Sequence, residues 1–302
     1  MDCPAREGRE NLEGHWMKPK EAEFDTINSG WVEFLLECWH GELPHSYTLR
    51  HRSWIRSNGN STRWVVKNLK EAADKYWWNN SGAEKSKEDF KLLRARLQKS
   101  MNDPAAEGLR QTCLDILKWG GVGGNTKKGE NPTVGWINRA VGSDALRHNI
   151  RQAVQYLSEG NSDKFDGSSF VMNSGATKII ALADPSEKII IYDGRVGCAL
   201  AYLANVYLTK IKKGSLPDFL RYGWGGARSK DVNRNPNTPG RIFPRLGSLP
   251  HSDRKHAEYA YRASKLIETL LEAADCRLVA RDWEAALFMI GYEIPDSTST
   301  KI

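Results

Sequence analysis

Apolar side chains recur every three to four residues along most of this chain, a spacing that places them on one face of an α-helix. The only β-branched run, Ile189-Ile190-Ile191, is too short to anchor a sheet. The pattern predicts an all-α fold. The predicted helices cover residues 29–39, 62–78, 86–100, 105–118, 132–141, 144–158, 168–183, 194–209, 254–274 and 282–291.

Composition narrows the class of protein further. The chain has 302 residues, of which 40% are hydrophobic and 11 are tryptophans, so it can bury a full core. It has no run of 18 apolar residues and no apolar stretch of signal-peptide type near its N-terminus. Five scattered cysteines include no C-x-x-C pair and are expected to be reduced thiols. We therefore expect a cytoplasmic monomer that needs no membrane, metal or cofactor.

Positive charge is concentrated in the middle of the chain. The formal net charge is +7, and residues 1–40 carry −5, residues 41–204 carry +7, residues 205–265 carry +9 and residues 266–302 carry −4. A basic middle between acidic ends suits a protein that meets a polyanion with one face, and nucleic acid is the commonest polyanion. The alternative is a basic surface that is simply solvated.

Two irregular stretches interrupt the helical pattern. Residues 119–129 are rich in glycine and include Lys127 and Lys128, but they match neither the phosphate-loop motif nor the dinucleotide motif. They predict a basic turn that can approach a phosphate, or else a plain interhelical loop.

The second irregular stretch, residues 223–250, is longer than a normal connection and interleaves basic with aromatic residues. We expect it to bind nucleic acid, unless it is a disordered linker. The candidate DNA contacts in it are Arg228, Lys230, Arg234 and Arg241.

Residues 168–196 carry the most chemical information. Asn173-Ser174-Gly175 can form a tight hairpin, after which residues 176–183 restart as a helix. A helix that begins at a turn exposes unpaired amides and the positive end of its dipole, which would seat a DNA phosphate. The predicted DNA contacts of this segment are Asn173, Ser174, Gly175, Ala176, Thr177 and Arg195.

Two pieces of this segment resemble a known enzyme family. Met172-Asn173-Ser174-Gly175-Ala176-Thr177-Lys178 and Tyr192-Asp193-Gly194-Arg195-Val196 are similar to the hairpin and aspartate elements of the helix-hairpin-helix DNA glycosylases, the superfamily of the 8-oxoguanine and endonuclease III type enzymes. The resemblance covers about thirty residues. It implies an all-α fold around a cleft, flipping of a base out of duplex DNA, and an aspartate essential for cleaving the N-glycosidic bond.

The resemblance assigns catalysis to Asp193 and raises a question about Lys178. Asp193 would stabilise the cationic sugar or activate water, although it could serve only as the N-cap of helix 194–209. Lys178 lies one place late relative to the family's lysine, so that Thr177 occupies that position. Lys178 is therefore a nucleophile, a phosphate contact or an exposed helix lysine. Arg195 is a clamp on the DNA backbone or a surface charge.

Aromatic residues could stack on bases or fill the core. Trp77, Trp78, Trp283, Phe288 and Met289 fall on apolar helix faces, so we expect them in the core. For Trp119, Trp136 and Trp224, near glycine-rich or basic loops, both roles stay open.

The sequence thus predicts a helical N-terminal region (1–120) and a glycosylase-like region (121–302), which can also form one unit. The predicted function is excision of a damaged or modified base from double-stranded DNA, for instance hypermodified phage DNA in host defence. The alternatives are a non-enzymatic helix-hairpin-helix DNA-binding module and an RNA-binding or RNA-processing protein.

Overall fold

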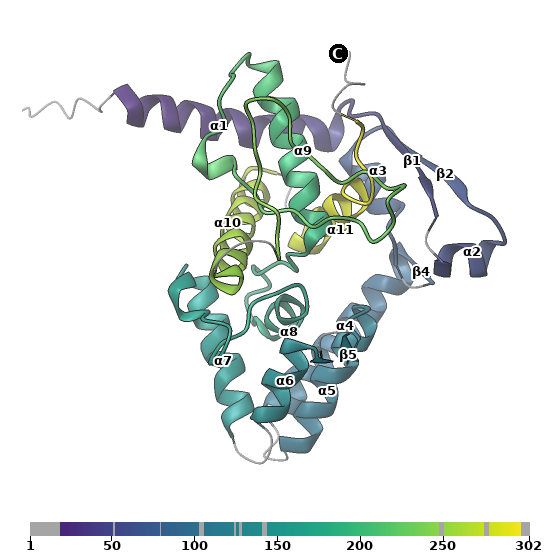
Figure 1. Ribbon diagram of the computed structural model, residues 1–302, viewed down its shortest axis with the longest axis vertical. Helices are drawn as coiled ribbons and strands as arrows, with labels where there is room; N and C mark the ends of the chain where they lie inside the picture. Colours follow the sequence, from purple (N-terminus) through teal and green to yellow (C-terminus); the bar gives the residue numbers. More distant parts are fainter. Residues whose placement is uncertain are drawn as a thin grey trace, which may run out of the picture.

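The computed structural model describes residues 19–50, 52–78, 80–102, 106–123, 125–126, 129–140, 144–247, 251–274 and 278–296. Within these ranges the protein is mostly helical, as predicted (Figure 1). The helices are α1 (Pro19–His40), α2 (Arg52–Asn58), α3 (Leu69–Asp74), α4 (Ala83–Asn102), α5 (Ala106–Trp119), α6 (Pro132–Arg139), α7 (Ala145–Ser158), α8 (Ala176–Ala183), α9 (Gly194–Lys210), α10 (Ser252–Ala273) and α11 (Ala280–Ile290), with 3₁₀ turns η1 (Ser162–Lys164) and η2 (Asp218–Leu220). Three short antiparallel pairs join β1 (His45–Leu49) to β2 (Thr62–Val66), β3 (Trp77–Trp78) to β4 (Ser81–Gly82) and β5 (Asn125–Thr126) to β6 (Gly129–Glu130).

The helices form two lobes, and the chain crosses between the lobes twice. In Figure 1 the upper lobe contains α1–α3 and α9–α11, and the lower lobe contains α4–α8. Helix α3 packs on α11 and α1 packs on α9 and α10, whereas α4, α5 and α7 all pack on α8. Buried side chains on both sides of residue 120 belong to one hydrophobic cluster, so the domain boundary expected there stays a prediction.

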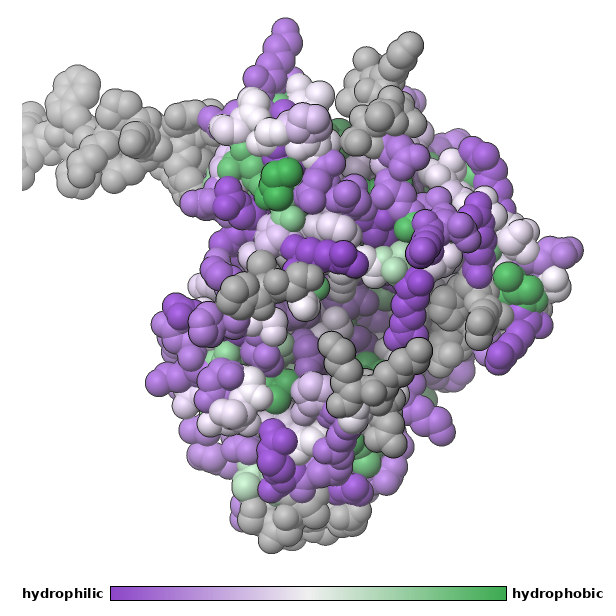
Figure 2. All heavy atoms as spheres, viewed as in Figure 1, coloured by the Kyte–Doolittle hydropathy of each residue, from purple (hydrophilic) through white to green (hydrophobic). Residues whose placement is uncertain are grey.

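Helix α8 lies at the centre of the lower lobe. All eight of its residues are buried, which fits a helix that is apolar on every face. The face of the molecule shown in Figure 2 is mostly hydrophilic and is hollowed between the two lobes.

The predicted helix 62–78 is wrong. Residues 62–66 form β2, because they pair with β1 and because Trp64 stacks on Tyr47 with the ring centroids 4.7 Å apart. A new helix, α3, starts after Asn68, whose side chain accepts a hydrogen bond from Glu71 N (2.8 Å). Tertiary pairing thus overrides the helical spacing in the first five residues of this segment.

The predicted helix 168–183 also begins later than expected, at Ala176. Before it, Asp166 Oδ1 accepts hydrogen bonds from the amides of Ser168 (2.8 Å), Ser169 (2.8 Å) and Phe170 (3.3 Å). Such side-chain capping offers the backbone an alternative to a helix, so these residues form a turn.

Residues 223–247 form no helix but are held firmly in place. Trp224 Nε1 donates to Phe243 O (3.2 Å), and Trp224 pairs with Arg245 in an isolated bridge. The guanidinium of Arg241 donates to Asn205 O (3.1 Å) and Lys213 O (2.6 Å). The linker alternative is therefore wrong for this part of the stretch.

The first turns of α9 are packed unusually close to their neighbours. Gly225 N donates to Gly194 O (3.0 Å), and a Cβ added at Gly194 would lie 2.7 Å from Gly225 Cα. A Cβ at Gly197 would overlap Gly223 O, and one at Gly291 would overlap Arg195 O. The long loop and the end of α11 thus fix the start of α9 from two sides.

Three of the five cysteines lie within the described residues. Cys38, Cys113 and Cys198 are buried free thiols, and burial raises the pKa of each to about 12. They act as apolar core side chains, as expected. In the part of the chain that the structure describes, no helix has the length and hydrophobicity needed to cross a membrane.

Candidate functional site

Lys178 and Asp193 line the same cavity. Lys178 comes from α8 in the lower lobe, and Asp193 immediately precedes α9 in the upper lobe. The cavity has a volume of about 50 Å³, which holds one or two water molecules. It is lined by Tyr76, Trp78, Trp119, Gly120, Lys178, Ile191, Asp193, Arg281, Glu284 and Phe288. The structure thus brings the two predicted catalytic residues together.

Asp193 is the N-cap of α9. Its backbone is extended (φ −116°, ψ 179°), and its Oδ1 accepts hydrogen bonds from the amides of Arg195 (2.8 Å) and Val196 (3.1 Å). Among the described residues, none donates a hydrogen bond to the second carboxylate oxygen, Oδ2. The cap holds the carboxylate in one orientation and leaves one oxygen available to a ligand.

Lys178 is 7% exposed, so it is not the exposed helix lysine of the third interpretation. Burial lowers its pKa, whereas the charge of Asp193 raises it. Its Nζ donates to Ser174 O (2.7 Å), and its aliphatic chain lies against Gly120, where a Cβ would overlap Lys178 Cδ. The glycine-rich segment therefore has a function that its sequence did not reveal, since it makes room for this lysine.

Aromatic rings form much of the cavity wall. Trp78 Nε1 donates to Trp119 O (3.1 Å), and the rings of Trp78 and Phe288 meet edge to face with centroids 5.4 Å apart. Trp78 and Phe288 are half-buried: they pack against the hydrophobic core, and they also line the cavity. Trp283 and Met289 are core residues as predicted, at 0% and 1% exposure.

The other aromatic residues divide between wall and core. Trp119, left open by the sequence, lines the cavity and is half-buried. Trp136 and Trp224 are buried, and the indole nitrogen of Trp136 donates to Ser169 O (3.0 Å). Trp77 is half-buried and contacts Trp54 edge to face. Within this group, only Trp119 is in a position to face a ligand in the cavity.

Hydrogen bonds to Tyr192 O fix the backbone just before Asp193. Thr177 Oγ1 donates to this carbonyl (3.2 Å), and so does His256 Nε2 (2.9 Å). Thr177 is fully buried, so the residue in register with the family's lysine ties α8 to the aspartate element. The next residue, Lys178, faces the cavity instead.

The burial of His256 predicts that stability depends on pH. Burial lowers its pKa from 6.5 to about 4, although the Tyr192 carbonyl and Asp193 oppose the shift. The unfolded state therefore binds more protons between pH 6.5 and 4, and the free energy of unfolding falls as the pH drops through this window. The expected loss is about 3 kcal/mol at the lower end.

Urea unfolding of the wild type and of His256→Gln at pH 7, 5.5 and 4.5 measures this effect. The stability advantage of the wild type should shrink as the pH falls, because only the wild type has an imidazole at position 256 that takes up a proton on unfolding and must lose it again on folding. His45, whose pKa burial also lowers to about 4, contributes equally to both proteins. A gap that stays constant with pH would contradict the prediction.

The hairpin uses its amides internally. Asn173 Oδ1 accepts hydrogen bonds from the amides of Gly175 (2.8 Å) and Ala176 (3.1 Å) and from Thr133 Oγ1 (2.8 Å). Thr177 N donates to Asn173 O (3.0 Å). The expected unpaired amides at the start of α8 are therefore wrong, because the side chain of Asn173 caps the turn. Contact of this hairpin with DNA stays a prediction.

The side chains expected to contact DNA differ in exposure. Gly175, Ala176 and Thr177 are buried, and Asn173, Ser174 and Arg195 are half-buried. In the long loop, Arg228 and Lys230 are exposed, whereas Arg234 and Arg241 are half-buried and donate to backbone carbonyls. Lys127 and Lys128 lie outside the described residues.

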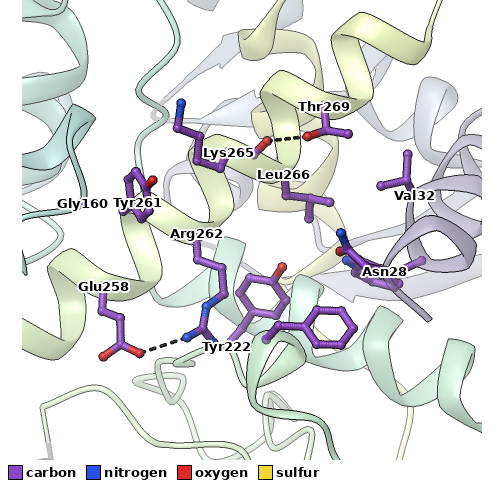
Figure 3. A pocket seen from close by; sticks show the side chains of 12 residues that line it. Asn28, Val32, Gly160, Tyr222, Glu258, Tyr261, Arg262, Lys265, Leu266 and Thr269 are labelled. Atoms are coloured by element: carbon purple, nitrogen blue, oxygen red, sulfur yellow. Dashed lines mark hydrogen bonds and ion pairs between the residues drawn. The ribbon is translucent and has the colours of Figure 1, made fainter. Parts of the chain in front are cut away.

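A second, larger cavity lies between α1 and α10 (Figure 3). It has a volume of about 480 Å³, and Tyr222, Tyr261 and Leu266 are among the residues that line it. Its charged side chains already have partners, because Arg262 points toward Glu258 (2.9 Å) and Lys265 pairs with Glu268 (2.8 Å). It lacks a buried acid and base that face one another, so the Asp193–Lys178 cavity is the better candidate site.

Within the described ranges, no group of three or more His, Cys, Asp or Glu side chains is arranged to hold a metal ion. In comparisons with known proteins, no family model, no curated protein and no solved structure matches the chain.

Proposed function

We propose that the protein is a DNA glycosylase that flips a damaged or modified base out of duplex DNA and hydrolyses its N-glycosidic bond. The observation that carries the proposal is the shared cavity, in which the free oxygen of Asp193 and the amine of Lys178 lie among aromatic rings. Base flipping is needed because the bond to the sugar is shielded within the stack.

The cavity residues suit this chemistry. Trp78, Trp119 and Phe288 offer ring faces and edges to a base, which stacks on aromatic side chains. As the base departs with its bonding electrons, the sugar gains positive charge, and the carboxylate of Asp193 stabilises it or removes a proton from the attacking water. The product is an abasic site. Since the cavity holds only one or two waters, its side chains have to move apart to admit a base.

The direct test incubates the protein with duplexes that contain normal, oxidised, alkylated or hypermodified bases, phage genomic DNA included. Hot alkali then cleaves the strand at any abasic site. Release from hypermodified DNA alone would support a role in host defence, and release of only small oxidised or alkylated bases would exclude that role. Duplex binding without base release would indicate a binding module, and a strong preference for structured RNA would end the glycosylase proposal.

The position of Lys178 predicts a covalent intermediate. Its amine can attack the sugar C1′ as the base leaves, and the ring-opened imine that results is reduced by borohydride to a stable protein–DNA adduct. The adduct should form with wild type and not with Lys178→Met. Its yield should rise with pH and reach its midpoint below 10.5, because burial lowers the pKa of Lys178 and only the neutral amine attacks.

The control for this experiment is Lys188→Met, which removes an exposed lysine paired with Glu268. It should form the adduct as wild type does. Abasic sites without any adduct in the wild type would show that the enzyme only hydrolyses, and Lys178 would then act on the site through its charge.

A further inference from the structure

The guanidinium of Arg195 sits on aromatic rings without a hydrogen-bond acceptor. Its Cζ lies 4.9 Å from the ring centre of Trp78, 4.4 Å from that of Phe288 and 5.0 Å from that of Tyr292. Among the residues that the structure describes, none accepts a hydrogen bond from this side chain. An arginine carries five N–H donors in a planar fork, so the donors of Arg195, near Asp193, are available to a ligand.

Two more donors gather around the same tyrosine. The Cζ atom of Arg234 lies 5.7 Å from the centre of the Tyr292 ring, and its Nε donates a hydrogen bond to Tyr292 O (2.8 Å). Tyr47 stacks on Tyr292 with ring centroids 4.8 Å apart, and its buried hydroxyl has no hydrogen-bond partner in the described part of the chain. An unsatisfied buried hydroxyl is costly, so it suggests that a ligand or a water completes the group. The three donors come from β1, from α9 and from the long loop.

Two arginines and two carboxylates, Asp193 and Glu293, influence this group electrostatically, but among the described residues neither arginine forms an ion pair. Arg234 lowers the pKa of Arg195, whereas Asp193 raises it, and burial is the largest cause of its fall to about 10. Asp193 already uses one oxygen on the amides of α9. Glu293 is near Tyr47 and Arg234, but within the described ranges no ion pair joins it to either arginine. By contrast, the other arginine of the cavity, Arg281, has Glu284 as its partner.

We propose that Tyr47, Arg195 and Arg234 form a seat for a phosphate group of the DNA backbone, directly beside the Asp193–Lys178 cavity. A phosphate supplies the oxygens that two guanidinium groups and a hydroxyl can share. This inference rests on the proposed function, for which it names the contact that holds the backbone while the rings of Trp78 and Phe288 hold the base. Those two rings also hold Arg195, so base and phosphate binding are linked.

The test measures the binding of an unmodified duplex by fluorescence anisotropy over a series of salt concentrations. Arg195→Met keeps the apolar contacts with the rings but removes the charge. It should weaken binding about tenfold and lower the slope of log K against log salt by about 0.9, the value for one lost phosphate contact. Tyr47→Phe should weaken binding severalfold while the melting temperature stays unchanged or rises, since the hydroxyl has no partner to lose.

The matched control is Lys91→Met, which removes an exposed cation of α4 outside the group. The affinity of this variant for the duplex should be closer to that of the wild type than the affinity of Arg195→Met is. If wild type, Arg195→Met and Tyr47→Phe bind the duplex with equal affinity and an equal slope of log K against log salt, the proposed phosphate seat is wrong. If Arg195→Met does not fold, Tyr47→Phe still tests the proposal, because this substitution removes only a hydroxyl and keeps the ring that packs on Tyr292.

A second arm uses inorganic phosphate against chloride at equal ionic strength. Phosphate should raise the melting temperature of wild type and not that of Arg195→Met, whereas equal stabilisation of both proteins would count against the seat. Neither arm requires base release. Duplex binding that depends on these residues, without any base release, would therefore support the phosphate seat and contradict only the glycosylase proposal.

Discussion

The variant Asp193→Asn should release bases about 10³-fold more slowly than wild type while its melting temperature stays nearly unchanged. The rate falls because the amide cannot stabilise a positive sugar or accept a proton from water, contributions that are worth about 10²–10⁴-fold in enzymes. The fold survives because asparagine caps a helix as well as aspartate does, so Oδ1 can still accept from Arg195 N and Val196 N. The measurements are the single-turnover rate of abasic-site formation and the melting temperature.

The control is Asp166→Asn, which makes the same change at an aspartate that caps three amides outside the cavity. It should retain the wild-type rate. Base release by Asp193→Asn at the wild-type rate would show that Asp193 is a helix cap and nothing more, and the protein would then fit a DNA-binding module better than an enzyme.

The variant Gly197→Ala should lower the free energy of unfolding by about 3 kcal/mol, at the upper end of the usual cost of overpacking. The added Cβ would overlap the carbonyl oxygen of Gly223, which belongs to the backbone and cannot rotate away as a side chain would. Either α9 or the long loop has to shift, and Asp193 stands one turn before Gly197. We therefore expect base release to fall together with stability.

Gly108→Ala is the matched control for this substitution. Gly108 is also in a helix, α5, but it is exposed and has nothing within 4 Å of the added Cβ. Since alanine favours a helix by about 1 kcal/mol over glycine, this variant should be slightly more stable than wild type. Urea unfolding of both variants compares them, and a Gly197→Ala protein as stable as wild type would mean that the start of α9 is not held rigidly.

Local signals explain why most of the helices could be predicted. Regular apolar spacing gave most of the helices to within a few residues, and Asp193 was identified as an N-cap from its place before an apolar periodic segment. The hairpin position was also indicated by Asn173-Ser174-Gly175. The hydrogen bonding of the hairpin could not be predicted, because a sequence does not show that the Asn173 side chain folds back and accepts hydrogen bonds from the amides of Gly175 and Ala176.

The cavity could not be predicted, because it depends on contacts between distant segments. Its wall combines Trp78, Trp119 and Phe288, which lie on three different parts of the chain. Apolar spacing predicted a core position for Trp78 and Phe288, but it could not distinguish a core contact from a cavity wall, and Trp78 lies in β3 rather than in a helix. That Thr177 binds Tyr192 O while Lys178 lines the cavity likewise depends on tertiary contacts.

The division into lobes has a consequence for the order in which the protein forms during synthesis. The lower lobe is continuous in sequence, from α4 to α8, whereas the upper lobe combines segments from both ends of the described chain. A nascent chain can therefore complete the lower lobe while α3 still lacks its partner α11. Phe288, on α11, is the last side chain in sequence order to join the cavity, so the nascent protein acquires its candidate site only after α11 has been synthesised.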